Sequence, residues 1–92
     1  MNEDFCTKET AARFAEAGLE HEGQLPQSLA LKWLREEKGI FVGIRMQEVS
    51  GDYWYEVMSS HGNHWDGVFK HYADAVENAI SYCISLINHD KL

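Results

Sequence analysis

The hydrophobic and polar positions of this chain change their spacing twice. Up to Gly39 the apolar side chains recur every three or four residues, which is the spacing of a helix with one buried side. From Ile40 to Phe69 they alternate with the residues between them, which is typical of a half-buried strand. After Phe69 the helical spacing returns. The pattern therefore predicts helices at both ends of the chain and a sheet between them.

Two helices are predicted before the alternating region. Thr7 can cap the first, over residues 8–17, and Gly18 can end it because glycine adopts the left-handed conformation without a steric cost. Pro26 suits the first turn of the second helix, and Gly39 ends that helix in the same way. Both helices are short, so their stability must come from packing against the rest of the chain.

The clearest helix is predicted over residues 72–87. Asp74 lies near its start, where the helix dipole favours a negative charge. An apolar stripe this wide has to be buried against another element. The residues of the stripe are Tyr72, Val76, Ala79, Ile80, Cys83, Ile84 and Ile87.

The alternating region is divided into strands by two polar turns. Strands are predicted over residues 40–47, 53–58 and 65–69, with turns at 50–52 and 60–63. Consecutive strands joined by short turns pair antiparallel. The sequence thus predicts an α+β fold in the order α-α-β-β-β-α, with the helices packed on one face of a three-stranded antiparallel meander.

Alternation assigns the strand residues to the two faces of the sheet. The face toward the helices is expected to hold Ile40, Val42, Ile44, Tyr55, Val57, Trp65 and Phe69. The other face, called the outer face below, is expected to hold Phe41, Arg45, Trp54, Glu56, Met58, His64 and Asp66. A slip of one residue exchanges the two faces of a strand, and the third strand is the most open to such a slip.

Three large apolar side chains on the outer face predict a docking surface. Phe41, Trp54 and Met58 would lie there among charged neighbours. Aromatic residues and methionine are enriched at protein interfaces. The alternatives are that the N-terminal segment folds across this face, or that the three side chains are scattered on the surface.

Composition limits the kinds of partner. The 92 residues suffice for one domain, 1–92, in which residues 1–6 are expected to be flexible. A net charge of −7 disfavours binding to nucleic acid and to anionic membranes, so the expected partner is a protein or a second copy of the chain as a homodimer. The chain has neither an apolar run of membrane-spanning length nor a secretory signal at its start, and a cytoplasmic location is expected.

Chemistry-bearing motifs are sparse. His61, His64 and Asp66 cluster around the second turn and are the weak candidates for a metal site, although their spacing matches no known closed site and turn histidines are usually solvated. Neither a glycine-rich phosphate loop nor a Gly-x-Ser-x-Gly elbow occurs. No catalytic residue and no cofactor are therefore predicted, and the two cysteines are expected to be free thiols.

Two segments carry a resemblance. They are LPQSLALKWLRE, residues 25–36, and FKHYADAVENAI, residues 69–80. Together they resemble a group of small uncharacterised proteins of gut anaerobic bacteria and of their phages and mobile elements. Those proteins pair a Pro-x-Gln-Ser-Leu…Lys-Trp-Leu-Arg-Glu helix with a final helix of the Tyr-Glu-Glu-Ala-Leu type. This chain differs at His71, where Thr or Ser is usual, and at Ala73, where an acid is common. The group has no assigned activity, so the resemblance implies a phage or mobile-element context and no mechanism.

The residues support three hypotheses of different classes. The leading one is a non-catalytic interaction or accessory protein that uses the outer face of the sheet. The alternative is an acidic mimic of nucleic acid that occupies the groove of a basic protein, which requires the acids to gather on one face. The third is a small metal-dependent enzyme that uses the turn histidines.

Overall fold

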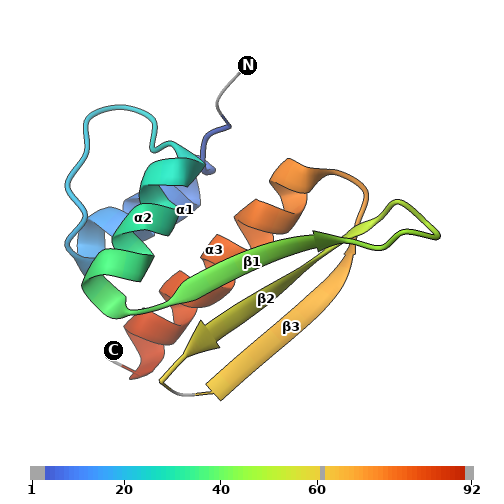
Figure 1. Cartoon of the computed structure of the whole chain (residues 1–92). Coiled ribbons are helices and arrows are strands. Elements are labelled where there is room, and N and C mark those ends of the chain that lie inside the picture. The colour runs from blue at the N-terminus through green and yellow to red at the C-terminus, as the bar shows by residue number, and fades with distance from the viewer. Residues whose placement is uncertain (1–3, 61, 91–92) are drawn as a thin grey trace.

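The computed structural model describes the backbone of residues 4–60 and 62–90. The elements follow the predicted order of two helices, three strands and a final helix (Figure 1). They are α1 (Lys8–Ala17), α2 (Gln27–Lys38), β1 (Phe41–Met46), β2 (Tyr53–Ser59), β3 (Gly62–Phe69) and α3 (Tyr72–Asp90). The predicted α+β fold is confirmed. None of the helices in this part of the chain is long and apolar enough to cross a lipid bilayer.

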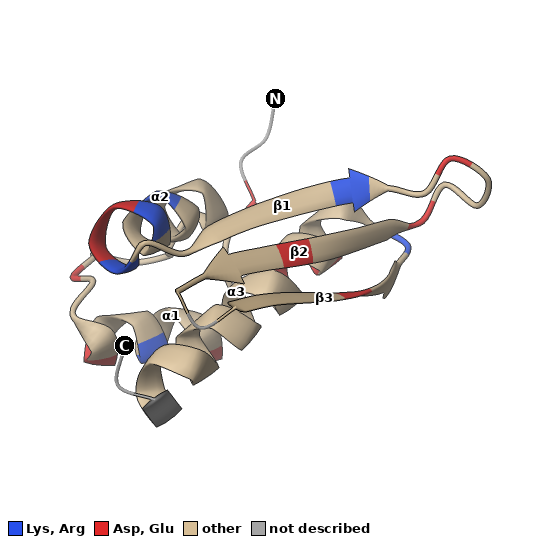
Figure 2. Ribbon diagram, turned by 60° about the horizontal axis from the view of Figure 1, so that its bottom comes forward, with Lys and Arg blue, Asp and Glu red and all other residues tan. Residues whose placement is uncertain are grey.

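The elements form a sheet with helices on one side of it. The strands lie in the order β1-β2-β3, and each neighbouring pair is antiparallel. Helix α3 contacts all three strands, and α1 and α2 pack against α3 (Figure 1). The described helices leave the outer face of the sheet uncovered (Figure 2). This arrangement follows from the wide apolar stripe of α3, which needs the sheet to bury it.

The predicted cap at Thr7 and the predicted ends at Gly18 and Gly39 are confirmed, whereas Pro26 precedes α2 as its N-cap and α3 continues past residue 87 to Asp90. The Thr7 hydroxyl accepts a hydrogen bond from the backbone N–H of Thr10 at 3.2 Å, which caps α1. Gly18 and Gly39 have φ values of 117° and 66° and follow α1 and α2 directly. Each has the left-handed conformation that a side chain would disfavour. Local capping chemistry thus sets the lengths of both short helices.

The core lies where the three helices meet the inner face of the sheet. Phe14 of α1 is fully buried, and its ring meets Trp33 of α2 edge-on at a centroid distance of 5.6 Å. Such an aromatic contact adds to the stabilisation from burying the two side chains. The other large, fully buried side chains are Leu25, Leu34, Ile40, Val57, Val76, Ile80, Cys83 and Ile84.

The described N-terminal residues, 4–6, are held against the start of α2 and do not cross the outer face. The backbone N–H of Cys6 donates to the carbonyl of Leu25 at 2.8 Å, and Phe5 forms a β-bridge with Pro26. Cys6 is only 8% exposed. The expected flexibility of residues 1–6 stays a prediction; residues 4–6 make these contacts, and residues 1–3 lie outside the described part of the chain.

The predicted faces of the third strand are wrong for its first half. Val57 faces the helices and pairs with His64, so His64 lies on the inner face and Trp65 on the outer face. Asp66, which pairs with Tyr55, also belongs to the inner side. The physical reason is the number of residues in the turn: Ser59 pairs with Gly62, which leaves two residues between the strands, whereas the predicted faces require an odd number.

A β-bulge reverses this exchange in the second half of β3. Trp54 pairs with Gly67, while its neighbour Tyr53 pairs with Phe69, which leaves Val68 as the extra residue. An extra residue shifts the alternation by one position. Phe69 consequently returns to the inner face and packs against the core, where the sequence predicted it.

The two edges of the sheet differ. Residues of β1 pair with β2 without interruption from Phe41 to Met46. The β3 edge carries the bulge, and there the Asp66 carboxylate accepts a hydrogen bond from the backbone N–H of Gly67 at 2.9 Å. A bulge and a charged residue on the inner side are both devices that stop an edge strand from pairing further.

Candidate functional site

The outer face of the sheet has a regular layout. Residues that pair across the strands stand side by side, because side chains at paired positions point to the same side. Three rows cross the face from β1 through β2 to β3. They are Phe41–Met58–Asn63, Gly43–Glu56–Trp65 and Arg45–Trp54–Gly67.

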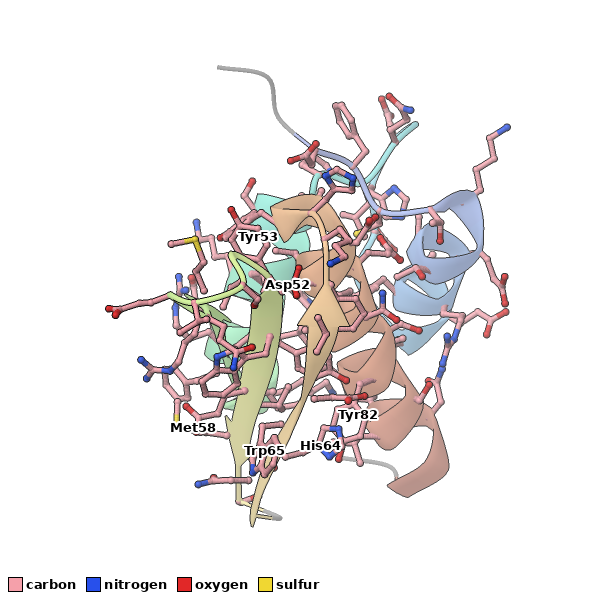
Figure 3. The ribbon with its side chains drawn as sticks, turned by 90° about the vertical axis from the view of Figure 1, so that its right-hand side faces the viewer. Asp52, Tyr53, Met58, His64, Trp65 and Tyr82 are labelled. Carbon is pink, nitrogen blue, oxygen red and sulfur yellow. The ribbon has the colours of Figure 1, made fainter. Side chains whose placement is uncertain are left out.

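All three residues predicted for the docking surface lie on this face. Phe41 and Met58 are adjacent and are 50% and 39% exposed, while Trp54 is partly buried two rows away, beyond the row of Glu56. Met58 points away from α3 (Figure 3). The structure therefore places the predicted residues on one face, with the row of Glu56 between Trp54 and the other two.

Trp65 is the residue of this surface that sequence reasoning missed. It is 70% exposed, the largest value for an aromatic side chain in the described part of the chain. The polar run from Ser59 to Asn63 fits a turn with an even or with an odd number of residues, and only an even-numbered turn, such as the two residues between Ser59 and Gly62, places Trp65 outside. The alternation of residues alone could not choose between the two turns.

A groove of about 460 Å³ runs between the two tryptophans of the outer face. Its lining consists of Gln47, Trp54, Glu56, Trp65, Gly67 and Val68. Gly67 is necessary for its shape, because a Cβ atom at this position would lie 2.5 Å from the Cβ of Trp54. Trp54 can cross toward β3 only because its partner has no side chain.

The only charged side chain that lines the groove, among the described residues, is Glu56. Its Oε1 lies 3.8 Å from Nη2 of Arg45, and the side chain of Glu56 is 25% exposed. The guanidinium of Arg45 also lies 5.8 Å from the ring centre of Trp54. A cation, a carboxylate and an indole ring are thus already in contact at one end of the groove.

The two described candidates for a metal site, His64 and Asp66, make other contacts. His64 stacks on Tyr82 of α3 with a centroid distance of 3.9 Å and an angle of 12° between the rings (Figure 3). Asp66 is engaged with the backbone of β3, and His61 lies outside the described residues. Within the described ranges, no three His, Cys, Asp or Glu side chains come together as metal ligands. His64 and Asp66 are instead structural parts of the inner side of β3.

The buried ionisable groups are held in their neutral forms. Burial raises the pKa of the Cys83 thiol to about 12. Burial and the nearby Glu77 raise the pKa of Cys6 to about 12 as well. The pKa of Tyr55 rises to about 12 through burial first and the charge of Asp66 second. Neither thiol has the exposed, thiolate-favouring surroundings of a nucleophile.

The acidic side chains are distributed over the molecule. Among the described residues they occur on α1, α2 and α3, on β2 and β3, and in the turn between β1 and β2 (Figure 2). A mimic of nucleic acid needs a continuous acidic surface that can replace a row of phosphates. This distribution gives the mimic hypothesis no support.

Comparison with family models, with curated proteins and with solved structures found no match to this chain. The resemblance of residues 25–36 and 69–80 to small proteins of gut anaerobic bacteria and their phages therefore stays a prediction. The same holds for the expected cytoplasmic location.

Proposed function

We propose that this chain is a non-catalytic protein-interaction module that binds a partner protein through the outer face of its sheet. The observation that carries the proposal is the exposure of large apolar side chains on a face that the described helices leave bare. Phe41 is 50% exposed, Met58 39% and Trp65 70%. A group of exposed aromatic and methionine side chains is typical of an interaction surface.

The charge of the chain favours a basic partner over a second copy. A net charge of −7 repels another copy of the same chain and attracts a positively charged surface. Glu56 adds a negative charge in the middle row of the face itself. The partner in this proposal is therefore a protein with basic side chains at its binding surface, and the homodimer is the competing outcome.

The chemistry of the described side chains supports a non-catalytic role. Cys83 is fully buried and protonated, and His64 is stacked against Tyr82. A nucleophile needs an adjacent base and access to substrate. An exposed face that carries large apolar side chains and a groove suits recognition of a protein surface better.

The proposal is tested by placing a charge on the outer face. A protein captured by the wild-type chain is purified, and its affinity is measured by calorimetry. Trp65→Glu should weaken binding by about tenfold or more, because a large exposed aromatic is a typical hot spot. Val49→Glu is the matched control: it adds the same charge at a side chain that is 98% exposed in the β1–β2 turn, and should change the affinity by less than about twofold.

Two outcomes would overturn the proposal. One is equal binding of the partner by Trp65→Glu and wild type. The other is a concentration-dependent dimer of the wild-type chain in sedimentation experiments that Trp65→Glu abolishes, because a second copy would then occupy the face in place of a basic partner.

A further inference from the structure

The groove on the outer face combines two indole rings with a single carboxylate. Glu56 pairs directly with Trp65 across the strands and lies two residues from Trp54 on the same face. The faces of indole rings carry negative electrostatic potential, and a carboxylate beside them adds a full charge. The rest of the lining is Gln47, Gly67 and Val68, which brings no positive charge. The groove is therefore electrostatically suited to a cation with flat, apolar surfaces.

Arg45 of the same chain illustrates this chemistry at one end of the groove. Its guanidinium lies 5.8 Å from the centre of the Trp54 ring, and its Nη2 lies 3.8 Å from Oε1 of Glu56. The second distance is too long for a hydrogen bond, so Glu56 can still accept one from a ligand. The Arg45 side chain is 61% exposed, and exposed ion pairs of this kind are weak. Arg45 is thus a resident cation that a better-placed one can displace.

The size of the groove limits what it can hold. A volume of about 460 Å³ lies at the lower end of the range for small-ligand pockets. This suffices for one side-chain head group with part of its stem. Between the two basic side chains, arginine fits better than lysine, because its planar group can stack on an indole ring while it donates hydrogen bonds to a carboxylate.

We infer that this groove binds the guanidinium group of an arginine side chain, held between Trp54 and Trp65 and hydrogen-bonded to Glu56. The inference rests on the proposed function for the source of the arginine, which is the basic surface of the partner protein. The recognition itself depends only on residues of this chain, and it can be measured without the partner.

The test uses two small probes and the indole N–H signals of the 15N-labelled protein. N-acetyl-arginine methylamide is titrated against the neutral analogue N-acetyl-citrulline methylamide, which has a closely similar shape. The signals of Trp54 and Trp65 should move in a saturable manner in the millimolar range. Trp33 is an internal control, since it packs against Phe14 away from the outer face. The arginine probe should bind about fivefold more tightly than citrulline, as expected for a cation over aromatic rings.

Three variants separate this site from general electrostatic attraction. Glu56→Gln should remove the preference for arginine over citrulline. Glu36→Gln makes the same change in net charge on an exposed position of α2 and should keep the preference. Arg45→Ala should strengthen binding of the arginine probe by about twofold to fivefold, because the resident cation no longer competes for Glu56. A merely structural role for Arg45 would not produce this gain.

Equal binding of both probes, or no shift of the Trp54 and Trp65 signals, would overturn the inference. Weaker binding by Arg45→Ala would overturn it too. These results are distinguishable from failure of the proposed function. If the probe does not bind but Trp65→Glu still weakens the partner, the interaction surface stands and the arginine site falls. If the probe binds but no partner depends on Trp65, the arginine site stands and the proposed function falls.

Discussion

Gly67 is the residue on which the shape of the outer face most directly depends. A Cβ atom there would lie 2.5 Å from the Cβ of Trp54 and 3.1 Å from its Cα. The backbone of β2 cannot move away, because it is paired on both sides. The close approach of Trp54 to β3 is therefore possible only with glycine at this position.

Gly67→Ala is expected to lower the free energy of unfolding by about 1–3 kcal/mol, the usual cost of forcing extra atoms into a packed site. It should also change the fluorescence of Trp54. Gly43→Ala is the matched control, since Gly43 lies on the same face and a Cβ atom there would meet nothing within 4 Å. Urea denaturation of both variants would contradict the argument if they lost equal stability.

Cys83 should make the fold sensitive to alkaline conditions. Burial raises the pKa of its thiol from 9.0 to about 12, so the folded state keeps a proton that the unfolded chain releases above about pH 9. The contribution of Cys83 is complete below pH 9 and is lost as the pH rises toward 12, by up to about 1.4 kcal/mol per pH unit. Urea denaturation of the reduced protein between pH 8 and about pH 10.5 measures this slope.

Cys83→Ala supplies the comparison. This variant is less stable at neutral pH because it leaves a small cavity, but its stability should fall less steeply with rising pH than that of the wild type. Parallel slopes for the two proteins would mean that the thiol of Cys83 is not the group responsible.

At the level of single elements, β3 shows what a pattern of residues can and cannot predict. Both ends of α1 and the C-terminal end of α2 are predicted correctly because Thr7, Gly18 and Gly39 act on their own neighbours. The faces of β3 depend on the number of residues between Ser59 and its partner in β3. The alternation of apolar and polar residues does not determine this number. Trp65 was therefore placed on the wrong side, while Phe69 was placed correctly because the bulge at Val68 compensates.

The new assignment of β3 reverses an expectation about stability. His64→Ala should lower the free energy of unfolding by about 1 kcal/mol, because it removes the stacked contact with Tyr82. Trp65→Ala should cost less than about 0.5 kcal/mol, since its side chain is 70% exposed. The faces predicted from alternation alone require the opposite order. Thermal or urea denaturation of the pair decides between the two.

At the level of the whole molecule, one small core supports both the helices and the sheet. Phe14 is fully buried at the contact of α1 with α2 and α3. The outer face contributes little to this core, since Phe41 and Trp65 are largely exposed. The core and the proposed interaction surface thus lie on opposite sides of the sheet, and variants of the outer face can be tested in a folded protein.

Phe14→Ala should lower the free energy of unfolding by about 3–5 kcal/mol, a large part of the total for a domain of this size. Phe41→Ala makes the same substitution on the outer face and should cost less than about 1 kcal/mol. The division between the two sides of the sheet fails if circular dichroism and urea denaturation find similar losses for both variants.

The candidate site was predictable only in part, for a physical reason. Phe41, Trp54 and Met58 belong to β1 and β2, which share an unbroken register. The groove adds Trp65 and Gly67, and it exists because these residues of β3 meet β2 at particular positions. Contacts between strands join residues that are separated in the sequence, and the register of the strands decides which residues meet. A one-residue change in the register rearranges the whole surface.

The unequal edges of the sheet bear on how copies of this chain behave when concentrated. A fibre grows through the strands only if both edge strands of every molecule can form backbone hydrogen bonds with a neighbouring molecule. Here β1 is a regular strand, whereas the bulge and Asp66 prevent β3 from pairing with a further strand. Growth through the strands would halt once two β1 edges had met, and we therefore expect the irregularity in β3 to limit polymerisation of a chain with a bare apolar surface.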